Sequence, residues 1–370
     1  MPNCIRICAV GLFALVTAAA GPLWAQPRIE LPPYQGDATF AAPPAGGAAL
    51  DGTILDGSAQ GWDPYGNPNY SHQQQPGVFP QAAGGDGYPG RQYIYVMPDG
   101  TVIRLPRLLQ RLRGSHTWVG GDSGLDVEWH TTEVDGTFGF PFLWTNTPLF
   151  LTPGIAAHFV DGPDATPGAF SDLPDSLFDA FLDVGWQPQI TPQFGVDLGV
   201  RVGVYGEWDE INDDSIRVMG RGLAIFTSSP QFEWRIGVIY VDRLDVKILP
   251  AGGLIWTPNP DWRWEVIFPQ PKLAWRVTTI GLTDWWFYVA GEYGGGQWTL
   301  ERFFSPPAPV TDTVDYSDLR VILGLEWIRN KRLRGNVEVG YVFNREVQYR
   351  SGVGNFDPDD TFMVRMEVAF

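Results

Sequence analysis

From residue 125 to residue 370, apolar and polar side chains alternate along the chain with a period of two. In the segment 194–205 (FGVDLGVRVGVY) one face carries Phe194, Val196, Leu198, Val200, Val202 and Val204. The other face carries Gly195, Asp197, Gly199, Arg201 and Gly203. The pattern recurs in 232–243, 319–327 and 336–344. Strict alternation over about ten residues predicts β-strands, here with one broad apolar face and one face of charges and glycines.

Two architectures fit these strands. A soluble sandwich or barrel would bury the apolar face, whereas a transmembrane barrel would turn it toward lipid. The strands are too many, and their apolar faces too uniformly rich, for one soluble core to hold. Tryptophans near the predicted strand ends match the aromatic girdles of membrane barrels: Trp129, Trp144, Trp186, Trp208, Trp256, Trp262, Trp264, Trp285 and Trp327. The pattern therefore predicts an all-β fold, a transmembrane antiparallel up-and-down β-barrel.

Connection lengths predict the topology, because outer-membrane barrels place short turns in the periplasm and long loops outside. Short turns are expected at 144–148, 188–193, 228–231, 258–261, 281–284 and 330–333. Longer or acidic connections are expected at 161–176, 209–214, 302–312 and 350–360. Strict alternation of the two sides requires tight outer turns at 134–136 and 269–271, which yields about 14 strands. If one or both are bulges within longer strands, the count is 12.

The C-terminus carries the most specific signal. The last residues, TFMVRMEVAF, place five apolar side chains on one face: Phe362, Val364, Met366, Val368 and Phe370. A closing strand with this alternation and a terminal Phe resembles the assembly signal of bacterial outer-membrane barrels. The resemblance implies two partners, the barrel assembly machinery and outer-membrane lipid.

The N-terminal part has a different character. Residues 1–25 combine one cation with an apolar stretch at 7–20 that is too short to span a bilayer, which predicts a cleaved signal peptide. Both cysteines, Cys4 and Cys8, lie in this segment, so the mature chain is expected to lack thiols. Residues 26–90, rich in Pro, Gly and Gln, predict a disordered linker. Residues 91–114 predict a small hairpin around Pro98-Asp99-Gly100 and a short basic helix at 106–114, forming a neck or plug before a barrel at 115–370.

Composition narrows the function. The formal net charge of −17 excludes nucleic acid as an expected partner, because phosphates require Lys and Arg. The chain has no apolar run of 18 residues that would predict a spanning helix. With the signal peptide and the closing strand, these facts predict export to the outer membrane. The sequence does not indicate an oligomeric state.

The polar faces of the strands predict a lumen lined by both signs of charge. The expected lumen residues are Asp197, Arg201, Glu233, Arg235, Glu292, Arg320, Glu326, Glu338, Arg365 and Glu367. A barrel of 12 to 14 strands has room for a small pore unless loops fill it. Mixed charges in a pore predict a narrow, water-filled channel. Mutual pairing of the same charges predicts instead a closed, salt-bridged interior.

Catalytic signals are weak. His130 is expected on an inward face with Asp126 and Glu128, where acid–base chemistry is conceivable. His158 lies near Asp161, Ser171 and Asp172, but no sequence marker places a Ser beside it. The four histidines, which include His72 and His116, show no ligand spacing. We therefore predict no catalytic residue, no cofactor and no metal centre, and thus not an enzyme.

Three acidic clusters lie in predicted outer loops. They comprise Asp209, Glu210, Asp213 and Asp214; Asp312, Asp315 and Asp318; and Asp357, Asp359 and Asp360. Dense oxygen ligands can bind Ca²⁺, although none of the clusters has the spacing of a specific calcium loop. Solvated surface charge is the simpler interpretation, and weak Ca²⁺ binding is the alternative.

The body of the chain resembles uncharacterised bacterial outer-membrane β-barrel families of porin-like appearance, known only as domains of unknown function. The resemblance covers about 125–370 and rests on LPAGGLIWTPNPDWRWEVIFPQPKLAW, AGEYGGGQW, GYVFNREVQY and the Phe-terminal strand. It implies fold and location, and it carries over no catalytic residue.

The sequence thus predicts an outer-membrane β-barrel that acts as a porin-like passive channel for small polar solutes. The first alternative is a closed structural or surface-interaction barrel that acts through its acidic loops. The second alternative is an outer-membrane hydrolase, which would require a hydroxyl nucleophile held beside a His.

Overall fold

The computed structural model describes residues 92–96, 102–106, 108–121, 126–140, 149–163, 172–188, 190–209, 211–302, 309–329 and 333–370. The predicted signal peptide (1–25) and linker (26–90) lie outside these residues and stay predictions. None of the described residues forms a helix long and apolar enough to cross a membrane.

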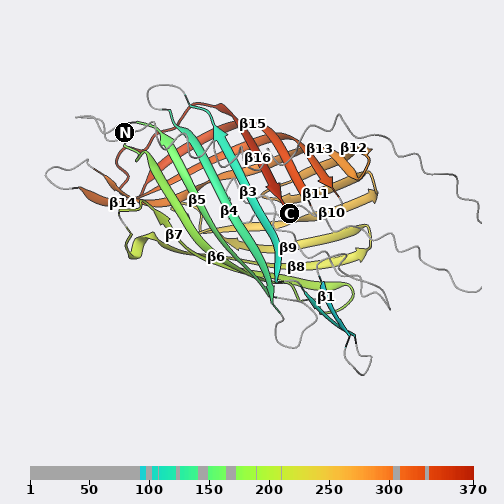
Figure 1. Ribbon diagram of the computed structural model, residues 1–370. Coiled ribbons are helices and arrows are strands. Elements are labelled where there is room, and N and C mark those ends of the chain that lie inside the picture. The colour runs from blue at the N-terminus through green and yellow to red at the C-terminus, as the bar shows by residue number, and fades with distance from the viewer. Residues whose placement is uncertain are drawn as a thin grey trace, which may run out of the picture. The chain divides into compact units, whose positions relative to one another are not determined.

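The described chain is almost entirely β, with one 3-10 turn, η1 (Asp213–Ser215) (Figure 1). Its strands are β1 (Gln92–Val96), β2 (Val102–Pro106), β3 (Leu109–Val119), β4 (Glu128–Phe140), β5 (Leu149–Asp161), β6 (Ser176–Trp186), β7 (Phe194–Gly206), β8 (Ile216–Ser229), β9 (Phe232–Tyr240), β10 (Ile248–Asn259), β11 (Trp262–Phe268), β12 (Lys272–Ile280), β13 (Thr283–Arg302), β14 (Val310–Arg329), β15 (Leu333–Tyr349) and β16 (Thr361–Ala369). Strands β1 and β2 form a separate two-stranded antiparallel sheet.

Strands β3 to β16 form one closed barrel, in which each strand pairs antiparallel with its sequence neighbours. The last strand closes on the first, with Val368 paired to Gly114 and Met363 to Val119. The predicted all-β, 14-stranded, up-and-down barrel is therefore confirmed. Closure leaves no free sheet edge, which is the condition for a β-structure in lipid.

The basic helix expected at 106–114 is wrong, because Leu109–Val119 form β3, the first barrel strand. The barrel therefore begins at residue 109 instead of 115. Arg111 and Arg113 point to the interior, where both meet Asp135 of β4. The local spacing of leucines and arginines resembles one face of a helix. The carboxylate of Asp135, which pairs with both arginines in the strand, lies more than 20 residues away in the sequence, so the local pattern does not reveal it.

The tight outer turn expected at 134–136 is also wrong. These residues lie within β4, where Val134 pairs with Gly114 and Gly136 with Leu112. The predicted count of 14 is right, although the sequence pattern divides 125–140 into two strands and omits β3. The turn at 269–271 does separate β11 from β12, whereas the connection 241–247 between β9 and β10 is one that the sequence pattern does not mark.

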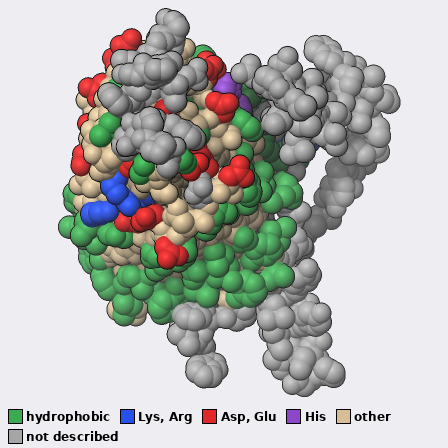
Figure 2. All heavy atoms as spheres, turned by 90° about the vertical axis from the view of Figure 1, so that its left-hand side faces the viewer, with side chains coloured by type: hydrophobic (Ala, Val, Ile, Leu, Met, Phe, Trp, Pro, Cys, Tyr) green, Lys and Arg blue, Asp and Glu red, His purple; other side chains and the backbone are tan. Residues whose placement is uncertain are grey.

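Burial along the strands is inverted relative to a soluble protein. On β7, Leu198, Val200 and Val202 are 42%, 48% and 45% exposed, whereas Asp197 and Arg201 are 2% and 1% exposed. Figure 2 shows exposed hydrophobic side chains gathered along the flank, while most acidic side chains in view lie away from them. A polar interior and an apolar exterior are the pattern of a transmembrane barrel.

Aromatic side chains cluster at the two ends of the apolar belt. At the inner end, ring centroids are 5.8 Å apart for Trp262 and Trp275 and 6.0 Å apart for Trp285 and Trp327. At the outer end, further aromatics pair, among them Tyr341 with Phe362 at 5.5 Å and Phe178 with Trp208 at 4.0 Å. These two sets have the positions of interfacial girdles. Trp129, expected in a girdle, is instead buried inside the barrel.

Candidate functional site: the lumen and its outer mouth

The lumen is lined by the residues that the sequence places there. All ten face the interior and are at most 9% exposed: Asp197, Arg201, Glu233, Arg235, Glu292, Arg320, Glu326, Glu338, Arg365 and Glu367. The alternation that places them inside also turns Phe362, Met366 and Phe370 outward, at 60%, 41% and 53% exposed. Val364 and Val368 lie on the same outer face and are half-buried.

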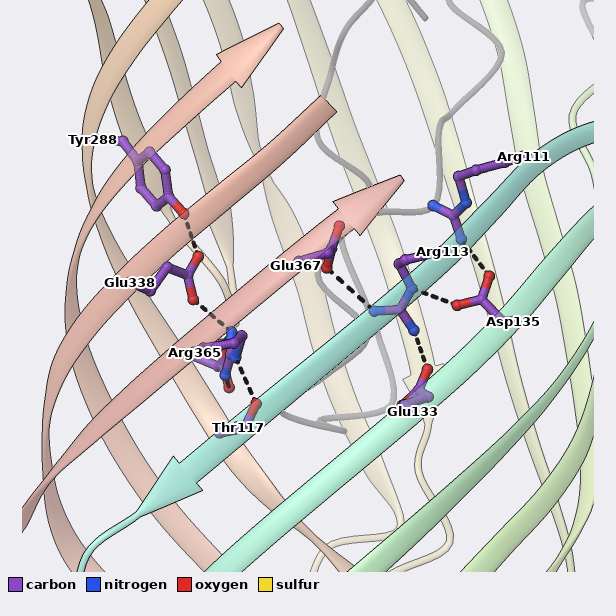
Figure 3. A network of polar contacts seen from close by, with 10 residues as sticks. Arg111, Arg113, Thr117, Glu133, Asp135, Tyr288, Glu338, Arg365 and Glu367 are labelled. Atoms are coloured by element: carbon purple, nitrogen blue, oxygen red, sulfur yellow. Dashed lines mark hydrogen bonds and ion pairs between the residues drawn. The ribbon is translucent and has the colours of Figure 1, made fainter. Parts of the chain in front are cut away.

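The first group of charges lies where the barrel closes, around Arg113 of β3 (Figure 3). Its guanidinium forms ion pairs with Glu133 and Asp135 of β4, and its Nη1 lies 3.4 Å from Oε2 of Glu367 on β16. Arg111 reaches the same Asp135, with 2.9 Å between Nη2 and Oδ1. The group joins three adjacent strands, including the first and the last.

A second group surrounds Arg365 of β16. Its Nη2 lies 2.9 Å from Oε1 of Glu292 on β13, and its Nη1 lies 2.9 Å from Oε2 of Glu338 on β15. Its Nε donates to Thr117 Oγ1 at 3.3 Å, and Tyr288 donates a hydrogen bond to Glu338 (Figure 3). One arginine thus joins strands that are not neighbours.

Other lumen arginines are held in the same way. Arg320 donates from Nε to Asp318 at 2.7 Å and from Nη1 to Glu292 at 3.0 Å. On β9, Arg235 donates from Nε to Glu233 at 2.6 Å. Each guanidinium therefore has a carboxylate within hydrogen-bond distance.

Toward the inner end, Glu326 of β14 collects three cations. Its carboxylate oxygens lie 3.4 Å from Arg263 Nη2, 3.6 Å from Lys272 Nζ and 3.6 Å from Arg334 Nε. Arg263 also lies 3.1 Å from Glu265, measured from Nε to Oε1. The group around Glu326 thus has one more cation than carboxylates, whereas the group around Arg113 has one more carboxylate than cations.

On the opposite wall, Arg221 of β8 bridges two carboxylates. Its Nε donates to Asp197 at 3.0 Å, and its Nη1 donates to Asp183 at 3.5 Å. Arg201 lies 3.6 Å from the same Asp183, from Nε to Oδ2. Buried apolar side chains of β8 to β11 also face the interior on this side: Met219, Leu223, Ile239, Ala251 and Ile267.

The described lumen is therefore a packed interior rather than a hydrated wall. Charges that line a water-filled pore keep contact with solvent, whereas Arg365 and Glu326 are both 0% exposed. A charge removed from water must be paired and hydrogen-bonded to be tolerated. Arg113, Arg320 and Arg365 meet that requirement.

The outer mouth is covered by an extension of β13, β14 and β15 that we call the flap, residues 294–302, 310–317 and 345–349. Strands β13 and β14 are 20 residues long, far more than a membrane crossing needs. Beyond Gly294 both faces of β13 are buried, with Trp298, Thr299 and Leu300 at 5%, 0% and 0% exposure. Thr299 forms a parallel bridge with Gly206 of β7, although β8 to β12 lie between these strands around the barrel. The flap therefore crosses the mouth.

The three strands of the flap bend at one level. Gly295 has a φ of 99°, Asn344 has a φ of 51°, and the pairing of β14 with β15 shifts between Ser317 and Leu319. A Cβ on Gly295 would lie 1.8 Å from the Tyr316 carbonyl oxygen. Glycine is thus required at this bend, which the GGG of AGEYGGGQW encodes.

Beneath the flap lies an aromatic stack that the sequence pattern does not reveal. The rings of Trp129 and Trp298 stack at 5.2 Å, and those of Trp129 and Tyr316 stack at 5.3 Å. Trp298 also donates from Nε1 to Asp179 Oδ1 on β6 at 2.7 Å. These contacts fix the flap to the wall across the lumen.

A buried arginine anchors the flap at its tip. Arg302 donates to Asp172 at 2.8 Å and to Asp312 at 2.9 Å, and its guanidinium carbon lies 3.5 Å from the Tyr349 ring centroid. Burial of the Asp312 carboxyl opposes its ionisation, but hydrogen bonds from Ser351 and Arg302 hold its pKa below the usual value. The anchor is therefore charged at neutral pH.

The candidate catalytic histidines lie elsewhere than expected. His130 and Glu128 face outward, with side chains 44% and 33% exposed, so the inward cluster with Asp126 is wrong. Asp126 does face inward but pairs with Arg345, at 2.7 Å from Nη1 to Oδ1. Residues on both faces of this end of β4 are polar, so alternation alone does not indicate which face is inside.

His158 does face the lumen, but with other partners. Its Nδ1 lies 2.9 Å from Thr131 Oγ1 and its Nε2 lies 3.0 Å from Asp179 Oδ2. This hydroxyl–imidazole–carboxylate order has the form of an activated nucleophile. The rings of Trp129 and Trp298 lie at 6.2 and 5.1 Å, and His158 is 2% exposed. A substrate would have to displace the flap to reach it.

The remaining candidates do not converge. Asp161 is exposed, Asp172 pairs with Arg302, and Ser171 and His72 lie outside the described residues. Within the described ranges, no group of three His, Cys, Asp or Glu side chains could hold a metal ion. The outer-loop position expected for Asp312, Asp315 and Asp318 is wrong, because all three lie within β14, where they are buried and paired with arginines. Weak Ca²⁺ binding at the other two acidic clusters stays a prediction.

The closed antiparallel barrel, with its apolar belt and polar interior, defines a transmembrane β-barrel of the outer-membrane type. Residues 171–354, which span β6 to β15, match the family model described as a domain of unknown function (DUF6268). The match confirms the resemblance to a barrel family without an assigned activity. A search of curated proteins gives no match.

Solved structures that match this chain include outer-membrane proteins. They include the NanC porin (12% identity, TM-score 0.31, covering 71% of this chain and 98% of that one). LpxR from Salmonella typhimurium has 11% identity and a TM-score of 0.33, covering 70% and 99%. An outer membrane channel from Pseudomonas putida F1 has 10% identity and a TM-score of 0.31, covering 70% and 92%. At TM-scores of 0.31 to 0.33, these likenesses carry no argument about this chain.

Proposed function

We propose that this protein is an outer-membrane barrel with a closed lumen, which acts through its outer surface rather than as an open pore. One observation carries the proposal: the lumen charges are paired with one another and withdrawn from solvent. Arg113, Arg201, Arg320, Arg365 and Glu326 are each at most 2% exposed. Charges that line an open pore stay hydrated, whereas a buried charge loses its hydration and needs an ion-pair partner to offset that free-energy cost.

The outer end offers the surface for this role. Asp209, Asp213 and Asp214 precede β8 and are exposed, as are Asp357, Asp359 and Asp360 before β16. Together with the formal net charge of −17, these loops favour a cationic or basic partner at the cell surface.

The test is electrical. Purified protein, shown to be folded by its different gel migration before and after boiling, is added to a planar lipid bilayer. The closed barrel produces no discrete conductance steps at a protein load at which a known porin does. Regular steps from the folded wild-type protein would contradict the proposal.

The porin-like passive channel for small polar solutes is the second candidate, and the bend at the base of the flap favours it. Three strands turn at one level, at Gly295, Asp318 and Asn344, so the flap has a defined line about which it could leave the mouth. A channel that opens in this way should conduct in an Arg302→Gln variant, which loses the anchor to Asp172 and Asp312.

Selectivity then separates a true pore from a damaged barrel. In the flap-released background, Arg320→Glu should shift the preference toward cations, because a fixed charge in a narrow passage is weakly screened. The matched control is Arg350→Gln, which removes an exposed outer pair with Asp214 and should leave the bilayer silent. If the folded Arg302→Gln protein shows no conductance, the channel hypothesis is contradicted and the closed barrel is supported.

A further inference from the structure

One patch of the outer wall breaks the apolar belt. On β3 and β4, five outward side chains form what we call the polar patch: His116, Trp118, Glu128, His130 and Thr132. Glu128 Oε1 accepts from Trp118 Nε1 at 3.1 Å and lies 2.8 Å from His130 Nε2. His116 Nδ1 lies 2.9 Å from Thr132 Oγ1, and the two imidazole rings are 5.9 Å apart. The patch is thus one connected polar group.

The patch has no counterpart on the other strands that the structure describes. On the other described strands, the outward positions between the two girdles carry apolar side chains or glycine. Examples are Ile155 on β5, Leu182 on β6 and Val339 on β15, which are 64%, 42% and 52% exposed. Polar side chains are disfavoured on the lipid face, so their confinement to one pair of strands calls for a partner there.

The depth of the patch supports this reading. His116 pairs with Met366 and Trp118 with Val364, both of which lie in the lipid-facing row of β16. The patch therefore lies beside the closing strand, toward its outer half. Among the described residues, His116 Nε2 and His130 Nδ1 have no hydrogen-bond partner. His116 and Thr132 thus lie within the apolar belt, at the level of Met366 and Val337, while Glu128 and His130 lie nearer its outer end.

We propose that the polar patch is the contact between two copies of this chain. The patch is self-complementary, because imidazoles, a hydroxyl and a carboxylate lie within one cluster and can pair with the same groups of a second copy. A two-fold axis along the membrane normal brings the two patches to the same depth without adjustment. A phosphate-bearing lipid would instead meet the Glu128 carboxylate directly, which is unfavourable.

The neighbouring surface allows close approach. Gly114 of β3 lies on the same outward face, directly below the patch, whereas Gly136 of β4 is covered by Phe138 and Leu112. A Cβ placed on Gly114 would meet nothing within 4 Å, so the surface is hollow there. Small residues beside polar ones are typical of contacts between membrane-spanning segments. The inference holds whether the lumen is closed or conducts.

Cross-linking in native membranes tests the proposal. A single Cys is placed at Val134, beside the patch, or at Val200 on β7 as the matched control; both are exposed apolar positions. The background carries Cys4→Ser and Cys8→Ser, and the reagent is a short bis-maleimide. Dimer is expected from position 134 and not from position 200. Equal cross-linking at both positions, or none at 134, would overturn the proposal.

A second variant ties the dimer to the patch itself. His116→Leu with Thr132→Val keeps the size of the side chains and removes one polar pair, which should lower the dimer at position 134 by about 3- to 20-fold. Folding is checked by the gel shift on boiling, so that loss of dimer in a folded protein counts. An unchanged dimer would refute the role of the patch. A monomer that co-purifies with lipid phosphate, lost in the double variant, would assign the patch to lipid and also refute the proposal.

Discussion

Removal of Arg113 should unbalance the group that closes the barrel. Arg113→Met keeps the unbranched apolar part of the side chain but leaves Glu133, Asp135 and Glu367 with one cation fewer. At an effective dielectric constant of about 20, a unit charge pair at the 3.4 Å between Arg113 Nη1 and Glu367 Oε2 is worth about 5 kcal/mol. Loss of one partner from a buried pair costs about 3–5 kcal/mol. We expect the free energy of unfolding to fall by that amount.

The assay is reversible urea unfolding in lipid vesicles, followed by tryptophan fluorescence and by the gel shift on boiling. Asp135→Asn and the double variant complete a thermodynamic cycle, in which the double variant should lose less than the sum of the two single losses. The matched control is Arg350→Gln, because its pair with Asp214 is exposed at both ends and should contribute at most about 1 kcal/mol. A loss for Arg113→Met as small as that of the control would refute the claim that the lumen charges are buried and paired.

The remaining predictions concern the strand faces and the flap. Met366→Arg places a cation on the lipid face within the belt, level with Val337, and should reduce folded protein in the membrane, at about 2–4 kcal/mol near mid-depth, while Val368→Arg, level with Trp327 of the inner girdle, should cost at most about 1 kcal/mol; equal amounts of folded protein for the two variants would contradict the position of the belt. Gly295→Ala should destabilise the flap by about 1–3 kcal/mol, because its φ of 99° disfavours a Cβ, and should speed proteolysis of the outer end without unfolding the barrel. The lowered pKa of Asp312 gives stability that is fully present above the usual value of 3.8 and is lost as pH falls through the lower folded value, so proteolysis of the flap should rise in strong acid and not between pH values of about 5 and 8.

The alternation of apolar and polar residues predicted the barrel well because most strands repeat the same pattern, with apolar residues facing outward and charged residues or Gly facing inward. On β7 every second residue is apolar and every other one is charged or Gly, and the structure keeps that division from Asp197 to Gly203. A one-residue slip would turn Asp197 and Arg201 into lipid, so the register is strongly specified. Strands with such a clean pattern are readable from the sequence alone.

Strands with polar residues on both faces are not readable in this way. Near the outer end of β4, His130 and Glu128 lie outside while Thr131 and Glu133 lie inside, so the period of two is present but its phase is ambiguous. The inner position of Arg113 depends on carboxylates of β4 and β16, which no local pattern reveals.

The closure of the mouth could not be predicted for a different reason. The flap is an ordinary continuation of β13 to β15 along the chain, and only its GGG and its length hint at a bend. The position of the flap across the mouth depends on contacts between distant strands. Thr299 pairs with Gly206, and Trp298 contacts Trp129 and Asp179. The sequence therefore indicates a lumen lined by charges but does not show that these charges are covered.

The most direct test of a closed lumen is the reactivity of one interior thiol. Ser115 faces the interior of β3 and is 3% exposed, and Ser115→Cys changes little in size. In a Cys4→Ser, Cys8→Ser background, a charged water-soluble thiol reagent should leave this cysteine unmodified in the folded barrel and modify it fully after unfolding. A cysteine at the exposed Ser228 serves as the positive control and should react at once in both states. Rapid modification of folded Ser115→Cys, at the rate of the Ser228→Cys control, would mean a water-filled lumen and would contradict the account.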